Sequence, residues 1–117
     1  MIEIKLVAAI ATVMPPGKVF ADVARSGTTA PWVVYQQVGG KSVVSLDQKL
    51  ADKRNGLFQV TTWATTRSEA TTKALQIEQA VMDSPLQVVP QGSIRAVYEP
   101  DTGLYGAMQD FSIWGDR

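Results

Sequence analysis

The pattern of hydrophobic and polar positions from Leu57 to Asp83 predicts a strand that leads directly into the longest helix of the chain. Side chains alternate between the two faces of a strand, so one face here carries Phe58, Val60, Thr62 and Ala64. Thr66 has the position of a helix cap, and Glu69 follows it at the spacing of a capping box. An apolar stripe then recurs at helical spacing: Ala70, Ala74, Ile77 and Val81. We therefore expect this strand and helix to pack together and form the centre of the core.

The rest of the pattern predicts a second helix and several further strands. Apolar residues at helical spacing from Ile2 to Val13 indicate an N-terminal helix, which Pro15-Pro16 ends. The predicted strands are Pro31–Val38, Ser93–Glu99, Leu104–Trp114 and a short segment within Val19–Val23. Turn residues are expected at Pro90–Gly92 and at Pro100–Gly103, and Gly106 is a candidate β-bulge.

This order of elements defines the fold class. It predicts a two-layer α+β domain, with a mainly antiparallel sheet of four to five strands and both helices packed on one face. A length of 117 residues favours a single domain over residues 1–117. A hydrophobic content of 45% is sufficient for an ordinary core, and 19% charged residues do not suggest disorder.

A charged segment between two of the predicted strands is the clearest candidate for function. Residues 41–56, KSVVSLDQKLADKRNG, predict a long flexible loop, which is unusual in a compact domain unless it binds something. Its candidate contact residues are Asp47, Lys49, Asp52, Lys53 and Arg54. Two interpretations stay open for its basic cluster: a solvated loop face, or a docking contact to an acidic partner or to DNA passing nearby.

The amino-acid composition argues against several classes of function. The chain has no cysteine and no histidine, which excludes disulfides, thiolate metal sites and histidine-based catalysis. The carboxylates show no acid–base or metal-ligand spacing. Gly39-Gly40-Lys41-Ser42 resembles the end of a phosphate-binding loop, but Tyr35 occupies the position where that motif needs its first glycine. We therefore expect no catalytic site, no cofactor and no metal, and predict that the protein is not an enzyme.

Charge and hydropathy narrow the choice of partner. Eleven acidic and eleven basic residues give zero net charge, which argues against a dedicated nucleic-acid-binding protein. No apolar run approaches the roughly 20 residues that span a bilayer, so no membrane association is expected. The N-terminal residues, MIEIKLVAAIATVM, fit a helix of the mature protein better than a signal peptide, because Glu3 is acidic and no small-residue cleavage site follows. Binding or assembly is the role that remains.

Nearly the whole chain resembles the tail completion, or tail terminator, proteins of long-tailed bacteriophages. The resemblance rests on the helix that ends near Pro15-Pro16, the strand PWVVYQ from Pro31, and the charged loop with its Ser-Leu-Asp start. It continues through QVTTWA with the following helix, and ends at the hairpin strand that closes with Phe111-Ser112-Ile113-Trp114.

The resemblance implies a structural virion protein that assembles in the host cytoplasm. Such proteins form a ring on the tail tube, commonly of six subunits, and present a surface to the head connector. The implied partners are further copies of the chain, the tail tube protein and the head connector protein. The alternatives are a head–tail connector or neck protein, and a small-ligand-binding α+β regulatory domain with a polar pocket.

Overall fold

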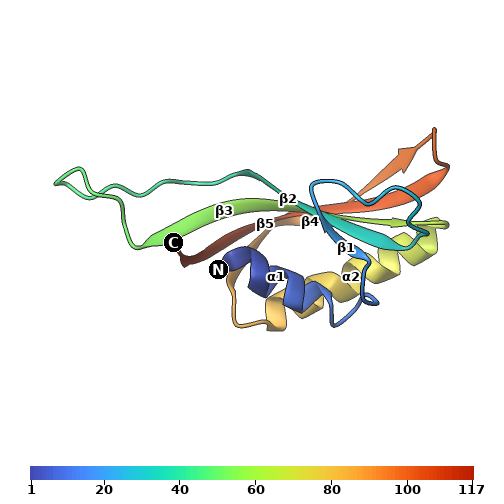
Figure 1. The fold of residues 1–117 in the computed structure, drawn as a ribbon, viewed down its shortest axis with the longest axis horizontal. Helices are drawn as coiled ribbons and strands as arrows, with labels where there is room; N and C mark the ends of the chain where they lie inside the picture. The colour runs from blue at the N-terminus through green and yellow to red at the C-terminus, as the bar shows by residue number, and fades with distance from the viewer.

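The computed structural model describes residues 1–117, and its elements form two layers (Figure 1). One layer is a five-stranded sheet, and the other contains the helices α1 (Ile2–Ile10) and α2 (Arg67–Asp83), which both cover the same face. The strands are β1 (Val19–Ala21), β2 (Trp32–Gly39), β3 (Lys53–Ala64), β4 (Gln87–Glu99) and β5 (Leu104–Asp116). The predicted α+β class is confirmed.

The sheet has the strand order β1-β2-β3-β5-β4 and is mostly antiparallel. The long neighbours β2, β3, β5 and β4 all pair antiparallel, and β3 and β5 align over twelve residue pairs from Lys53↔Asp116 to Ala64↔Tyr105. The three-residue β1 is the exception, because it runs parallel to β2 at the edge. The weak strand signal in Val19–Val23 therefore marks a real but short strand.

The β3–α2 unit forms the centre of the fold, as its pattern predicts. The alternating residues Phe58, Val60, Thr62 and Ala64 are all buried, and so are the stripe residues Ala70, Ala74, Ile77 and Val81. The Thr66 hydroxyl accepts a hydrogen bond from the Glu69 backbone N–H at 3.1 Å, which satisfies one of the unpaired donors at the start of α2. The apolar face of α1 closes the other half of the core with Ile2, Leu6 and Ile10.

Two predicted details of the C-terminal hairpin are wrong. The predicted turn at Pro90–Gly92 lies inside one continuous strand, β4, which absorbs it as a register shift between Gln91 and Arg95. Pro90 is tolerated there because β4 is an edge strand. The bulge expected at Gly106 is absent, since this residue pairs in regular register with Trp63 on one side and Val97 on the other.

Gly106 has a packing role instead. A Cβ atom at this position would lie 2.5 Å from Val97 Cγ2 and 2.8 Å from Trp63 Cζ3, closer than side chains approach. The Trp63 ring therefore lies against the backbone of β5, and only glycine leaves space for it.

We expect Gly106→Ala to lower the free energy of unfolding by about 1–3 kcal/mol, because the new methyl group must displace Trp63 or Val97. Denaturant unfolding followed by tryptophan fluorescence measures this change. Gly39→Ala is the matched control, since a Cβ at Gly39 meets nothing nearer than Leu57 carbon atoms at 3.9 Å. Equal stability of the two variants would contradict the packing role.

Candidate assembly surfaces

An arm formed by Gly40–Asp52 connects β2 to β3 and projects from one end of the molecule (Figure 1). It lies along the long axis of a molecule that measures 52 × 26 × 26 Å. The arm occupies most of the predicted loop at residues 41–56, and it contains three of the five predicted contact residues, Asp47, Lys49 and Asp52.

The outer part of the arm is a small β-hairpin. Val44 and Leu50 lie opposite each other in an antiparallel bridge, and Ser45 N–H donates to Lys49 O at 2.8 Å. A three-residue turn joins the two sides, closed by the hydrogen bond from Gln48 N–H to Ser45 O at 3.0 Å. Gln48 takes the left-handed conformation, with φ of 67°, which this type of hairpin turn requires at its last position.

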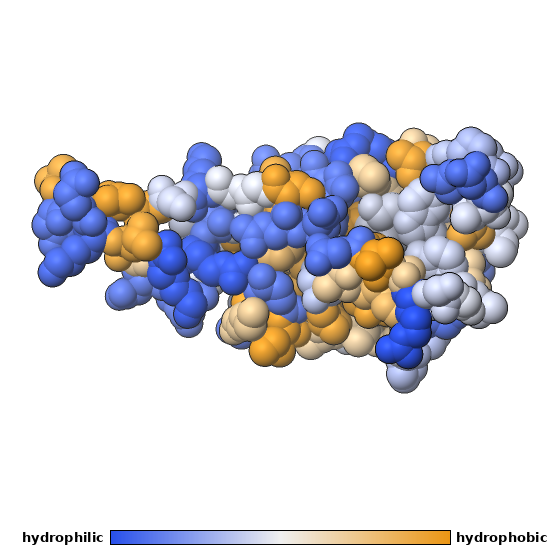
Figure 2. Space-filling view, turned by 45° about the horizontal axis from the view of Figure 1, so that its top comes forward, coloured by the Kyte–Doolittle hydropathy of each residue, from blue (hydrophilic) through white to orange (hydrophobic).

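The tip of this hairpin is apolar as well as charged (Figure 2). Leu46 stands in the turn with 105% of its reference surface exposed, and Val43, Val44 and Leu50 are exposed beside it. Asp47 and Lys49 form a loose, solvent-exposed ion pair at 3.9 Å. A hydrogen bond from the Ser45 hydroxyl holds the pKa of Asp47 below its usual value, so the tip carries a carboxylate at neutral pH. The charges were visible in the sequence, whereas the grouping of aliphatic side chains around them follows from the turn.

The other two predicted contact residues lie at the base of the arm, within β3. Strand β3 starts at Lys53, so the predicted loop at 41–56 is too long by its last four residues, 53–56. The turn signal of Asn55-Gly56 is overridden because both residues pair in register with Trp114 and Ile113 of β5. Lys53 forms an ion pair with Asp116 across the same two strands, which raises the pKa of Lys53.

Arg54 ties the base of the arm to the first helix. Its guanidinium donates two hydrogen bonds to Glu3 of α1, Nη1 to Oε1 at 3.1 Å and Nη2 to Oε2 at 2.8 Å. A third bond runs from Nη2 to Gln37 Oε1 on β2 at 3.0 Å. This bidentate geometry is the strong form of an ion pair, and both side chains are about three-quarters covered. Arg54 therefore stabilises the fold where the arm begins.

Asn55 fixes the start of the arm from the opposite side. Its Oδ1 accepts a hydrogen bond from Lys41 N–H at 3.0 Å, and its Nδ2 donates to Ser112 Oγ at 3.0 Å and to Ile113 O at 3.2 Å. Gly40 runs so close to the Asn55 carbonyl that a Cβ atom would meet it at 2.3 Å. The two ends of the arm are thus attached to the sheet, and the direction of the arm is defined.

The Glu3–Arg54 pair gives stability a specific pH dependence. The hydrogen bonds from Arg54 are the main cause that lowers the pKa of Glu3 from 4.5. Because the folded-state pKa lies below the unfolded one, the pair stabilises the protein fully above about 4.5 and this contribution disappears as pH falls through the lowered value. At neutral pH we expect Glu3→Gln to cost about 1–2 kcal/mol, a value discounted for partial exposure.

Denaturant unfolding of wild type and Glu3→Gln across acidic to neutral pH measures this. The difference in the free energy of unfolding between the two proteins should be largest at neutral pH and vanish in acid. In a double-mutant cycle, Glu3→Gln should have little effect when Arg54→Gln is already present. A difference that stays constant with pH, or that survives in the Arg54→Gln background, would show that the ion pair does not contribute in this way.

Trp32 and Trp63 lie on the face of the sheet opposite the helices. Trp32 on β2 and Trp63 on β3 lie directly opposite each other in the strand register. With Val34 and the loop residues Val23 and Ala24 they line a shallow hollow of about 430 Å³. Asp22 is the one charged residue that lines it. Part-exposed tryptophans are typical of interface cores, so this face is a second candidate contact surface.

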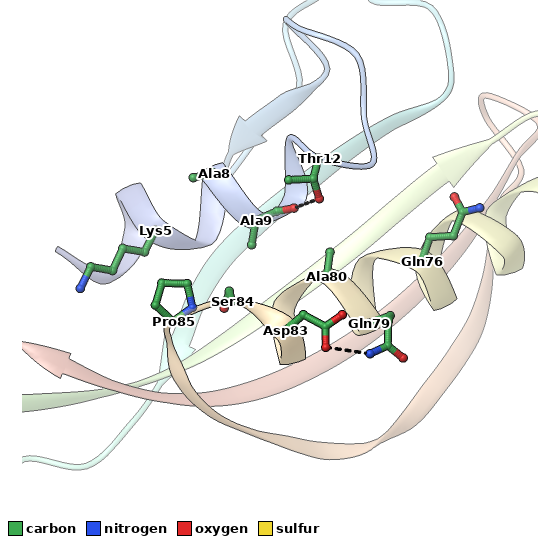
Figure 3. Close-up of a pocket in the computed structure, with 10 residues that line it drawn as sticks. All are labelled: Lys5, Ala8, Ala9, Thr12, Gln76, Gln79, Ala80, Asp83, Ser84 and Pro85. Atoms are coloured by element: carbon green, nitrogen blue, oxygen red, sulfur yellow. Dashed lines mark hydrogen bonds between the residues drawn. The ribbon is translucent and has the colours of Figure 1, made fainter.

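A third feature lies between the helices (Figure 3). The groove between α1 and α2 has a volume of about 560 Å³. Its small apolar residues are Ala8, Ala9, Ala80 and Pro85, and its polar ones are Lys5, Thr12, Gln76, Gln79, Asp83 and Ser84. Gln79 donates a hydrogen bond to Asp83 at 3.0 Å, and neither Asp83 nor Lys5 forms an ion pair within the chain. The sequence did not predict this groove, because it depends on how closely the two helices approach.

No group of three or more histidine, cysteine, aspartate or glutamate residues is placed to hold a metal ion. None of the helices has the length and apolar character that crossing a membrane requires.

Comparison with known protein families identifies one family that the chain matches. Residues 4–116 match the family described as Tail completion protein gp17. The chain therefore belongs to this family of phage tail completion proteins, which confirms the resemblance seen in its sequence. It is accordingly a structural component of the phage tail. No curated protein matches the chain.

Proposed function

We propose that this protein caps the tail tube as an oligomeric ring and forms the tail side of the head–tail junction. Membership of the tail completion family is the observation that carries the proposal. The arrangement of surfaces supports the proposal. Each subunit has a projecting arm at one end, and it also has the groove between α1 and α2 and the tryptophan hollow.

A ring needs two different patches on every subunit, one that contacts the next copy and one that receives the previous copy. The arm is suited to the first role because it extends beyond the body and exposes apolar side chains. Its charged residues are Lys41, Asp47, Lys49 and Asp52, while Lys53 and Arg54 anchor its base. Contacts that are weak singly become strong when repeated around a ring of commonly six subunits.

The remaining partners follow from the position of such a ring. One rim would bind the tail tube protein and stop its polymerisation, and the other would bind the head connector protein. Zero net charge suits a ring through which DNA passes without being held, since a basic lumen would bind phosphates. The protein would assemble in the host cytoplasm and remain in the virion. It would have no enzymatic role.

Removal of the gene from its phage tests the proposal. We expect that heads and tails fail to join, and that the unattached tail tubes exceed the normal length. Normal-length tails that fail to join heads would point instead to a connector or neck protein. Normal joined particles would contradict the proposal outright, and re-expression of the gene is the control for polar effects.

A further inference from the structure

We propose that the arm of one copy docks into the groove between α1 and α2 of the neighbouring copy. This inference rests on the proposed ring, and it names the partner surface that the ring would use. It joins two features of the chain that have no other partner, the apolar arm tip and the groove.

The arm tip needs an apolar partner. Leu46 projects from the turn with all of its surface exposed, and Val44 and Leu50 lie side by side on the same hairpin. Burial of a leucine side chain is favourable, and the isolated chain does not gain this stabilisation from these residues. A hairpin that is held in shape and exposes such a group indicates an interaction site.

The groove has the size and lining to receive that tip. Ala9 of α1 and Ala80 of α2 line it between the helices, and the exposed Ala8 and Pro85 lie at its edges (Figure 3). Because these side chains are small, a volume of about 560 Å³ stays open between the helices. A cavity of about 150 Å³ already holds a benzene-sized group, so the groove has space for Leu46 with its neighbours.

Charge makes the two surfaces complementary. The tip carries Asp47 and Lys49 on either side of Gln48, and the groove carries Lys5 on α1 and Asp83 on α2. Lys5 and Asp83 have no ion-pair partner in their own chain, so both are available to pair with the opposite charges of the arm. The tryptophan hollow fits less well, because Asp22 is its one charged lining residue and it offers no positive charge to pair with Asp47.

Geometry indicates that the groove belongs to another copy. The base of the arm is fixed by Asn55 and Arg54, and the arm points away from the helices of its own chain (Figure 1). Six residues, 40–45, lead from the sheet to the turn and give a reach of roughly 20 Å at strand spacing. This reach is similar to the 26 Å width of the molecule, so the tip can arrive at the helices of an adjacent subunit.

Engineered disulfides test this contact cleanly, because the chain has no cysteine of its own. The Leu46→Cys/Ala80→Cys double variant places one thiol on the arm tip and one in the groove. Mild oxidation at high protein concentration traps even a weak contact if the two Cα atoms approach within about 7 Å. Leu46→Cys/Leu75→Cys is the matched control, since Leu75 is exposed on α2 but does not line the groove.

The expected result is a ladder of covalent oligomers from the 46/80 variant, ending at the size of the closed ring, with only sporadic dimers from the 46/75 control. Peptide mass spectrometry should assign the bond to residues 46 and 80 of different chains. Equal cross-linking of the two variants, or no 46–80 bond, would overturn the inference. Rings that form without this bond would refute the docking contact but leave the proposed function intact. A 46–80 ladder from a protein that does not cap tails would support the docking contact but refute the proposed function.

Discussion

Shortening the arm should abolish particle joining while leaving the fold intact. The change replaces residues 44–50 by Asn-Gly, which is a favoured two-residue hairpin turn. Val43 and Ala51 are suitable ends because Ala51 N–H donates to Val43 O at 2.9 Å, so a tight turn spans them. If the arm supplies a contact that repeats around the ring, its loss should reduce complementation of a gene-deleted phage by about 10²–10⁴-fold.

The free energy of unfolding of the shortened protein must be measured as a control, to show that the protein still folds. The arm lies outside both buried clusters, so the free energy of unfolding should change by less than about 1 kcal/mol. Leu46→Asp should also reduce complementation, and Leu46→Met should retain it, because only the first places a charge at the apolar tip. Full complementation by a stable, shortened protein would show that the arm has no role in assembly.

Phe58→Ala should have the largest effect on stability, a loss of about 3–5 kcal/mol in the free energy of unfolding. Phe58 is 1% exposed and lies opposite the equally buried Phe111, where β3 and β5 pair beneath the helices. Truncation removes the contacts of the ring and leaves a cavity that the two central strands cannot close. Much of the total stability of a domain of this size would be lost.

Urea denaturation monitored by circular dichroism measures the change. Leu75→Ala is the control, because Leu75 is an exposed position of α2 and alanine is a good helix former, so its effect should stay within about 0.5 kcal/mol. A loss below about 1 kcal/mol for Phe58→Ala would mean that the core is not organised around the β3–β5 pair.

The central unit was predictable from the sequence because local signals agree there. Alternation in β3, the cap at Thr66 and the stripe on α2 each indicate the same element, and the buried faces match the predicted ones. The long strand β4 was predicted only in part. Its edge position lets it contain Pro90 and a positive φ at Gly92, two features that indicate a turn when the sequence is considered alone.

The candidate site was less predictable, because its features depend on contacts between distant residues. The local sequence places Lys53 and Arg54 in a charged loop, but their partners Asp116 and Glu3 come from the two ends of the chain. Gln48 gives no strong turn signal, so the hairpin that presents Leu46 was not visible. The groove depends on the approach of α1 and α2, which no periodicity within a single helix specifies.

Electron cryomicroscopy of the intact virion would show where this protein lies and how many copies surround the tail tube. We expect one ring of this protein at the head-proximal end of the tail tube, between the last tube ring and the connector, with each arm contacting the adjacent subunit. Density for the protein at the distal end of the tail, within the head, or as a single copy would contradict this expectation.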